Sequence, residues 1–117
     1  MLPASSASLL DLEVVSRLRE DFEPAQLESL LATFNSTLHE RLGRLQVALT
    51  HSDEPGSDAI LHSLKGSSAS FGARELSEAV VTLRRHLGTD RASCAGAVLQ
   101  LREIADQSVE HLRAQLL

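Results

Sequence analysis

A run of large apolar residues spaced three or four positions apart constrains this 117-residue chain more than any other feature. The run comprises Leu27, Leu31, Phe34, Leu38, Leu42, Leu45 and Leu49. That spacing places all of these side chains on one face of an α-helix. Pro24 comes just before the run and suits the first helical position, where its missing N–H would have no partner. We therefore predict one helix from Pro24 to about Thr50, roughly 40 Å long at 1.5 Å per residue.

Four further segments show the same helical spacing. The first is a short helix over residues 9–20 that Ser8 can cap, with a stripe formed by Leu12, Val15 and Leu18. The second begins somewhere between Asp53 and Ser57 and ends at Phe71. The last two cover about 73–87 and 90–117. We expect Gly72 and Gly88 to end the helices before them, because glycine tolerates the left-handed conformation of a helix stop.

The connections between the long helices are short, so neighbouring helices should run antiparallel. The predicted fold is therefore all-α: an up-down four-helix bundle spanning residues 9–117, with the short first helix across one end. Residues 1–8 are predicted to be a flexible tail. Aromatic residues make up only 3 % of the chain, and three prolines and six glycines occur. This composition favours an aliphatic helical core over a β-sandwich.

Charge and composition exclude several classes of function. The net charge is −5, and the chain lacks a basic stripe with stacking aromatics, so neither nucleic acid nor an anionic membrane surface is an expected partner. Cys94 is the only cysteine, which excludes an internal disulfide and indicates a buried structural thiol. No apolar run reaches membrane-spanning length, and the N-terminus does not resemble a signal peptide. We expect a cytoplasmic protein.

The helix that ends near Phe71 contains the side chains that are the best candidates for a chemical role. At 100° per residue, Ile60, Leu64, Ser67 and Phe71 should form its buried face. His62 should then lie in the middle of the exposed face, surrounded by Asp58, Ala59, Lys65, Gly66 and Ala69. A glycine inside a helix costs roughly 1 kcal/mol relative to alanine. Because Gly66 lies beside the histidine, bare backbone there would let another surface approach the imidazole.

The sequence His62-Ser-Leu-Lys65-Gly66-Ser67-Ser68-Ala-Ser-Phe71-Gly72 resembles the signature of the histidine-containing phosphotransfer (HPt) family of two-component phosphorelays. That family has His-x-Leu-Lys-Gly, two small residues, a bulky apolar residue and a glycine at these positions. The resemblance extends over most of the chain. It implies a helical bundle whose histidine accepts a phosphoryl group from the aspartate of a receiver domain and passes it to another receiver. The resemblance is compatible with a free-standing module or with the C-terminal domain of a hybrid sensor kinase.

The resemblance also assigns roles to individual residues. His62 would be the phosphoacceptor and Lys65 would balance the phosphate charge. The small residues Ala59, Gly66 and Ala69 would form the docking surface for the receiver. Mg²⁺ would belong to the receiver, so this chain is expected to need no metal or other cofactor. Many family members have a glutamine where this chain has Arg84, which leaves open a phosphate contact or an ordinary solvated charge.

Other functions are weaker hypotheses. No glycine-rich nucleotide loop is present, so the chain should act as a carrier and not as an enzyme with its own ATP site. The remaining histidines, at 39, 51, 86 and 111, fit solvent-facing helix positions, and none pairs into a metal motif. The chief alternative is an adaptor bundle that binds a receiver or another enzyme without being phosphorylated. A dimerising kinase domain is less consistent with the pattern, because this chain has enough helices to close a bundle as a monomer.

Overall fold

The computed structural model describes residues 5–89 and 91–117, without the side chains of 91–93 and 95. Six helices form this part of the chain, and it contains no strand. They are α1 (Ser6–Leu9), α2 (Leu12–Asp21), α3 (Pro24–Thr50), α4 (Glu54–Ser70), α5 (Arg74–Arg85) and α6 (Arg91–Leu116). The all-α prediction is confirmed. The expected start of the last helix at residue 90 and the first half of the expected tail, residues 1–4, lie outside the described residues.

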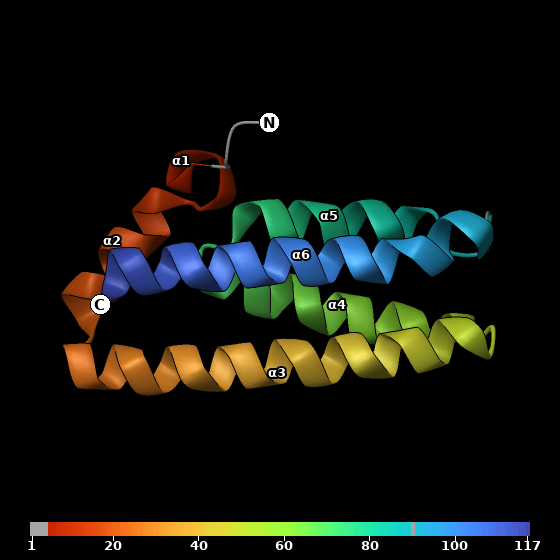
Figure 1. Cartoon of the computed structure of the whole chain (residues 1–117), viewed down its shortest axis with the longest axis horizontal. Helices are drawn as coiled ribbons and strands as arrows, with labels where there is room; N and C mark the ends of the chain where they lie inside the picture. Colours follow the sequence, from red (N-terminus) through yellow and green to blue (C-terminus); the bar gives the residue numbers. More distant parts are fainter. Residues whose placement is uncertain (1–4, 90) are drawn as a thin grey trace.

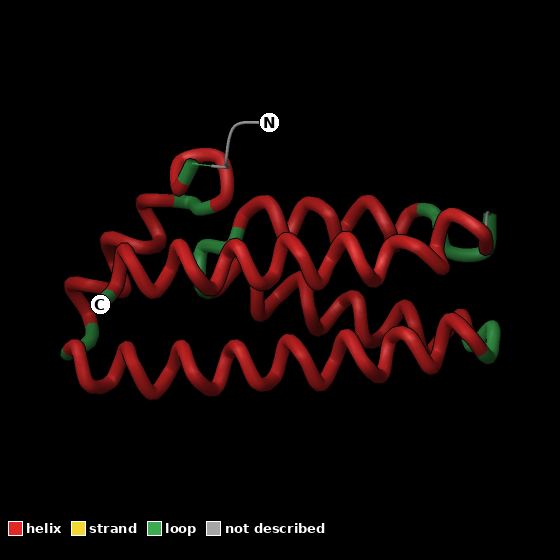
Figure 2. The backbone as a smooth tube through the Cα atoms, in the orientation of Figure 1, coloured by secondary structure: helices red, strands yellow, loops and turns green. Residues whose placement is uncertain are grey.

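The four long helices form a closed ring in which each packs against two neighbours. Helix α3 packs on α4 and α6, and α5 packs on the same two helices, so α4 and α6 lie diagonally across the bundle (Figure 1). Helix α1 contacts α5 and α6, while α2 crosses the end of the bundle and contacts α6 and α3. The α3–α4 loop and the described part of the α5–α6 loop lie at one end of the bundle, and the α4–α5 loop lies on the opposite side, where α3 and α6 extend past it toward α2 (Figure 2). This arrangement is the predicted up-down bundle.

The stops and starts of the central helices follow local chemistry. Pro24 begins α3, where Glu23 and Gln26 form a capping box. The Asp53 side chain caps α4 by accepting a hydrogen bond from the Gly56 N–H at 2.9 Å. Gly72 follows α4 with a φ of +73°, and a Cβ atom at this position would lie 3.0 Å from the Asp11 carbonyl oxygen. Only glycine fits both the backbone angle and the space.

The N-terminal region differs from the prediction of one helix over 9–20 capped by Ser8. The chain is helical from Ser6, bends at Leu10, and restarts with Asp11 as the cap of α2. Leu9, just before the bend, and Leu10, at the bend, are both fully buried. Leu12, expected on the buried stripe, is 43 % exposed. Residues 6–8 thus belong to the folded bundle and not to a tail.

The core is aliphatic and follows the predicted stripes closely. Six of the seven residues in the long stripe of α3 are buried, and Leu49 at its end is partly buried. Helix α5 contributes Leu76, Val80 and Leu83. The predicted stripe of α6 is buried throughout: Cys94, Val98, Leu101, Ala105, Leu112 and Leu116. Helix α4 completes the ring and exposes its outer face, on which His62 lies.

Candidate functional site

His62 lies in the middle of α4 and is exposed, as predicted, but the orientation of the helix differs from the expected one. The buried residues of α4 are Ser57, Leu61, Leu64 and Ser68. Ile60, Ser67 and Phe71, expected in the buried face with Leu64, are only partly buried. The buried face is thus rotated by roughly 60° at 100° per residue. His62 consequently lies on the flank of the exposed face that borders α5 and not at its centre.

This flank brings His62 next to Arg84, near the end of α5. The Arg84 guanidinium donates from Nε to Asp58 Oδ1 at 2.6 Å and from Nη2 to Asp58 Oδ2 at 3.2 Å. Its third nitrogen, Nη1, lies 3.0 Å from His62 Nδ1. Asp58 precedes His62 by four residues on α4, so both side chains lie on the same flank. Arg84 is therefore neither a free solvated charge nor an open phosphate contact in this structure.

The ion pair changes the titration of both partners. The hydrogen bond from Arg84 lowers the pKa of the Asp58 carboxyl below its ordinary value. The same bond raises the pKa of the Arg84 guanidinium above its already high ordinary value. Both side chains are partly open to solvent, at 47 % for Asp58 and 33 % for Arg84, so the pair is hydrated at its rim. It remains fully charged at neutral pH.

The other residues predicted for the site lie together on the outer surface of α4. Lys65, Gly66, Ala59 and Ala69 are all exposed. None of the ion pairs within the described part of the chain includes Lys65. A Cβ atom added to Gly66 would meet no atom within 4 Å, so packing inside the bundle does not require this glycine. The charge of Lys65 and the exposed backbone at Gly66 are therefore both accessible to a partner protein.

The two small residues after Gly66 face different neighbours. Ser68 is fully buried, and its hydroxyl has no hydrogen-bond partner in the described part of the chain. Ser67 lies at the border with α3 and accepts a hydrogen bond from Arg41 Nη1 at 2.8 Å. The Ser70 hydroxyl instead donates a hydrogen bond to the Gly66 carbonyl of its own helix, at 2.9 Å. Neither Ser67 nor Ser68 shares the flank of His62.

Three of the other four histidines have structural contacts. His39 pairs with Asp106 across α3 and α6 at 3.2 Å. The His111 ring bonds the Ser6 hydroxyl of α1 at 2.8 Å, and His51 bonds the Val47 carbonyl. His86 is exposed just after α5. Within the described residues no group of three histidine, cysteine or acidic side chains is arranged to hold a metal ion.

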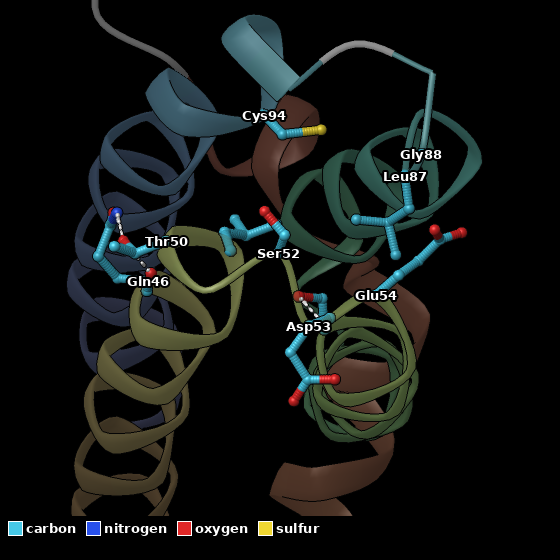
Figure 3. Close-up of a pocket in the computed structure, with 10 residues that line it drawn as sticks. Gln46, Thr50, Ser52, Asp53, Glu54, Leu87, Gly88 and Cys94 are labelled. Carbon is cyan, nitrogen blue, oxygen red and sulfur yellow. Dashed lines mark hydrogen bonds between the residues drawn. The ribbon is translucent and has the colours of Figure 1, made fainter.

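A hollow lined by Glu54, Pro55, Asp58, Arg84 and Leu87 lies beside the site. Two others that border α4 lie away from Arg84. One is at the loop end of the bundle, where Cys94, Leu87 and Gly88 face Ser52, Asp53 and Glu54 (Figure 3). Cys94 is buried, as predicted, and this hollow includes none of the residues predicted for the site. The other is a groove between α3 and α4 that reaches the outer surface of α4. It is lined by Glu40, Gly43, Arg44, Val47, Ala48, His51, Asp53, Gly56, Ala59 and Ile60.

Sequence reasoning placed Asp58 on the exposed face but gave it no role. Asp58 lies four residues before His62, and this spacing alone indicates that the two side chains are neighbours on one side of the helix. The partner of Asp58, Arg84, is 26 residues away in sequence and contacts it only through the packing of α4 on α5.

No helix in the described part of the chain is long and apolar enough to cross a membrane.

Comparisons with known proteins agree with this geometry. A family model described as "Hpt domain" matches residues 29–115, which include α4, α5, most of α3 and nearly all of α6. Among solved structures, the chain is similar to the histidine-containing phosphotransfer domain of ArcB from Escherichia coli, with a TM-score of 0.82 and 24 % identity. That match covers 97 % of each chain. A comparison with curated protein sequences finds no significant match.

Proposed function

Because the chain belongs to the Hpt domain family, whose members are histidine phosphotransfer modules of phosphorelays, we propose that His62 is its phosphoacceptor. In this proposal His62 receives a phosphoryl group from an aspartate of one receiver domain and passes it to an aspartate of another. The observation that supports it best is the exposed imidazole on α4 with Lys65 and Gly66 beside it. No other histidine of the chain has this surrounding.

The reaction needs no nucleotide on this chain. A lone pair on an imidazole nitrogen of His62 attacks the phosphorus of the receiver's aspartyl phosphate. The new N–P bond forms while the P–O bond to the aspartate breaks, and the electron pair leaves on the carboxylate. The ring proton that remains passes to solvent. The reverse sequence on a second aspartate completes the transfer. Phosphoryl transfer depends mainly on positioning and charge neutralisation, and Lys65 supplies a positive charge on the face of α4.

The proposed docking surface is the outer face of α4. Ala59, Gly66 and Ala69 leave little side-chain bulk around His62. Ala59 also lines the groove between α3 and α4, where Val47 is 57 % exposed and offers apolar contact. A receiver lying over this surface would contact both helices. Because one chain closes the whole bundle, docking requires no second copy, and we propose that the module acts as a monomer.

The test is incubation of the purified chain with a phosphorylated receiver domain. The expected product is acid-labile, base-stable phosphate on this chain, detected by intact-mass and peptide mass spectrometry. His62→Gln should abolish it without changing helical content, and His86→Gln is the matched control, because His86 is also exposed but lies outside α4. If the His62→Gln variant still accepts phosphate, the assigned residue is wrong. A receiver that binds without transferring phosphate supports the adaptor alternative.

A further inference from the structure

The contact between Arg84 and His62 determines which ring nitrogen carries the proton. A guanidinium group has five N–H donors, no acceptor, and a charge that it keeps at any physiological pH. The bond between Arg84 Nη1 and His62 Nδ1 can therefore exist only if Nδ1 presents its lone pair. A neutral imidazole has one proton for its two nitrogens. In the conformation seen here that proton must be on Nε2.

Asp58 holds Arg84 in the position that makes this contact. Two guanidinium nitrogens bond the two carboxylate oxygens, which orients the plane of the group and leaves Nη1 directed at the ring. The carboxylate and the imidazole both belong to α4, while the arginine comes from α5. The packing of these two helices thus builds a three-residue cluster of Asp58, Arg84 and His62.

From this geometry, and resting on the proposed function of His62, we infer that the Asp58–Arg84 pair is a latch that keeps the imidazole from acting as a nucleophile. The lone pair of Nδ1 is engaged by Arg84, and Nε2 has no lone pair in the ring plane because it is protonated. Neither nitrogen can attack phosphorus until Arg84 leaves Nδ1. Arg84 is then a positioning residue that acts through the tautomer of His62, not a residue that binds phosphate.

Release of the latch has a defined proton balance. When Arg84 moves away, water removes the Nε2 proton and another water protonates Nδ1. The freed Nε2 lone pair forms the N–P bond as the P–O bond of the donor breaks, and Nδ1 then loses its proton to solvent. A glutamine in place of Arg84 would differ from arginine in offering a carbonyl oxygen as well as an amide donor. It can accept a hydrogen bond from Nδ1–H and leave Nε2 free.

The first test is ¹⁵N NMR of the full chain labelled in its histidine rings, with His62 assigned by its loss in His62→Gln. In the unmodified protein at neutral pH, Nδ1 should show the shift of an unprotonated ring nitrogen and Nε2 that of a protonated one. Arg84→Gln should move the population toward Nδ1–H. Arg85→Gln is the control, because it removes the same charge from the adjacent exposed position. A protonated Nδ1 in the unmodified chain, or no change in Arg84→Gln, overturns the inference.

The second test measures phosphorylation of His62 by phosphoramidate, a small donor that needs no docking surface. Arg84→Gln should accelerate it by about 3- to 5-fold, a modest gain because solvent-exposed charge contacts are weak. Asp58→Asn should act in the same direction by loosening Arg84. Slower phosphorylation in Arg84→Gln would refute the latch and make Arg84 a phosphate contact. The NMR result involves no receiver, so it distinguishes failure of the latch from failure of the phosphorelay function.

Discussion

The substitution Gly66→Gln should have opposite effects on the stability of the bundle and on the rate of phosphoryl transfer from a receiver. Gly66 lies inside α4, is exposed, and has no atom within 4 Å of the position that a Cβ atom would occupy. Its φ is not in the left-handed region, so a side chain creates no backbone strain there. Glutamine is a much better helix former than glycine. The isolated bundle should accept the change without loss.

The expected gain in stability is small and calculable. Replacing a helical glycine by a good helix former stabilises by about 0.5–1 kcal/mol. Unfolding entropy near the midpoint is about 2.1 cal/mol/K per residue. For 117 residues this amounts to about 0.25 kcal/mol/K. The melting temperature of Gly66→Gln should therefore rise by about 2–4 °C. Thermal unfolding followed by circular dichroism measures this shift.

Phosphoryl exchange should respond in the opposite direction. A glutamine side chain beside His62 would hold a docked receiver away from the imidazole. A displacement near 1 Å can cost about 10²-fold in a reaction that depends on positioning. The rate of transfer from a phosphorylated receiver should fall by roughly that factor, while phosphorylation by phosphoramidate should be unaffected. Rapid-quench measurement of phosphate on the two proteins gives the rate.

Gly96→Gln is the matched control for this experiment. Gly96 is also helical and exposed, with open space around it, but it lies on α6, diagonally across the bundle from α4. It should gain the same stability and leave exchange unchanged. If Gly66→Gln exchanges phosphate with a receiver at the unmodified rate, Gly66 does not serve partner approach. The docking surface would then lie elsewhere on the bundle.

Three further predictions follow from individual side chains. Lys65→Ala should slow receiver transfer by no more than about 5-fold and leave the melting temperature unchanged, because an exposed charge contributes about 0–1 kcal/mol; an unaltered transfer rate would make Lys65 a solubilising charge. Since Arg84 lowers the pKa of Asp58, this carboxyl should stabilise the fold fully above about pH 4 and lose that contribution as the pH falls through the lowered pKa. Carboxyl ¹³C NMR should show Asp58 titrating below its ordinary range, and returning to it in Arg84→Gln; an ordinary value in the unmodified chain would contradict the pairing. Leu61→Ala, next to His62 but fully buried, should cost about 2–5 kcal/mol in urea unfolding, and a cost below 1 kcal/mol would show that the orientation of α4 is wrong.

The buried face of α4 and the shape of the N-terminal region differ from the predictions, because apolar spacing along the sequence is ambiguous at both places. The periodicity of α4 is ambiguous because Ile60, Leu61 and Leu64 are all apolar, and any two of them define a different buried direction. The helix packs on both α3 and α5, and the direction between those two neighbours selects Leu61 and Leu64. The bend at Leu10 is a second case. Leu9 and Leu10 are both fully buried there, and burial of these two apolar side chains stabilises the fold.

The sequence by itself determined the four long helices of the bundle and most of their ends. Apolar residues at steps of three or four are a local property, as are Pro24 at a helix start and Gly72 at a stop, so the bundle and the exposure of His62, Lys65 and Gly66 could be predicted. Only the tertiary structure decided what His62 contacts. Arg84 lies 22 residues from the histidine, and no local rule connects a position near the end of α5 to a ring nitrogen on α4. The orientation of α4 in its packing against α5 places Arg84 Nη1 3.0 Å from His62 Nδ1. Which residues of two antiparallel helices lie opposite one another depends on the helix lengths and on the loop between them, and these act together only in the folded bundle.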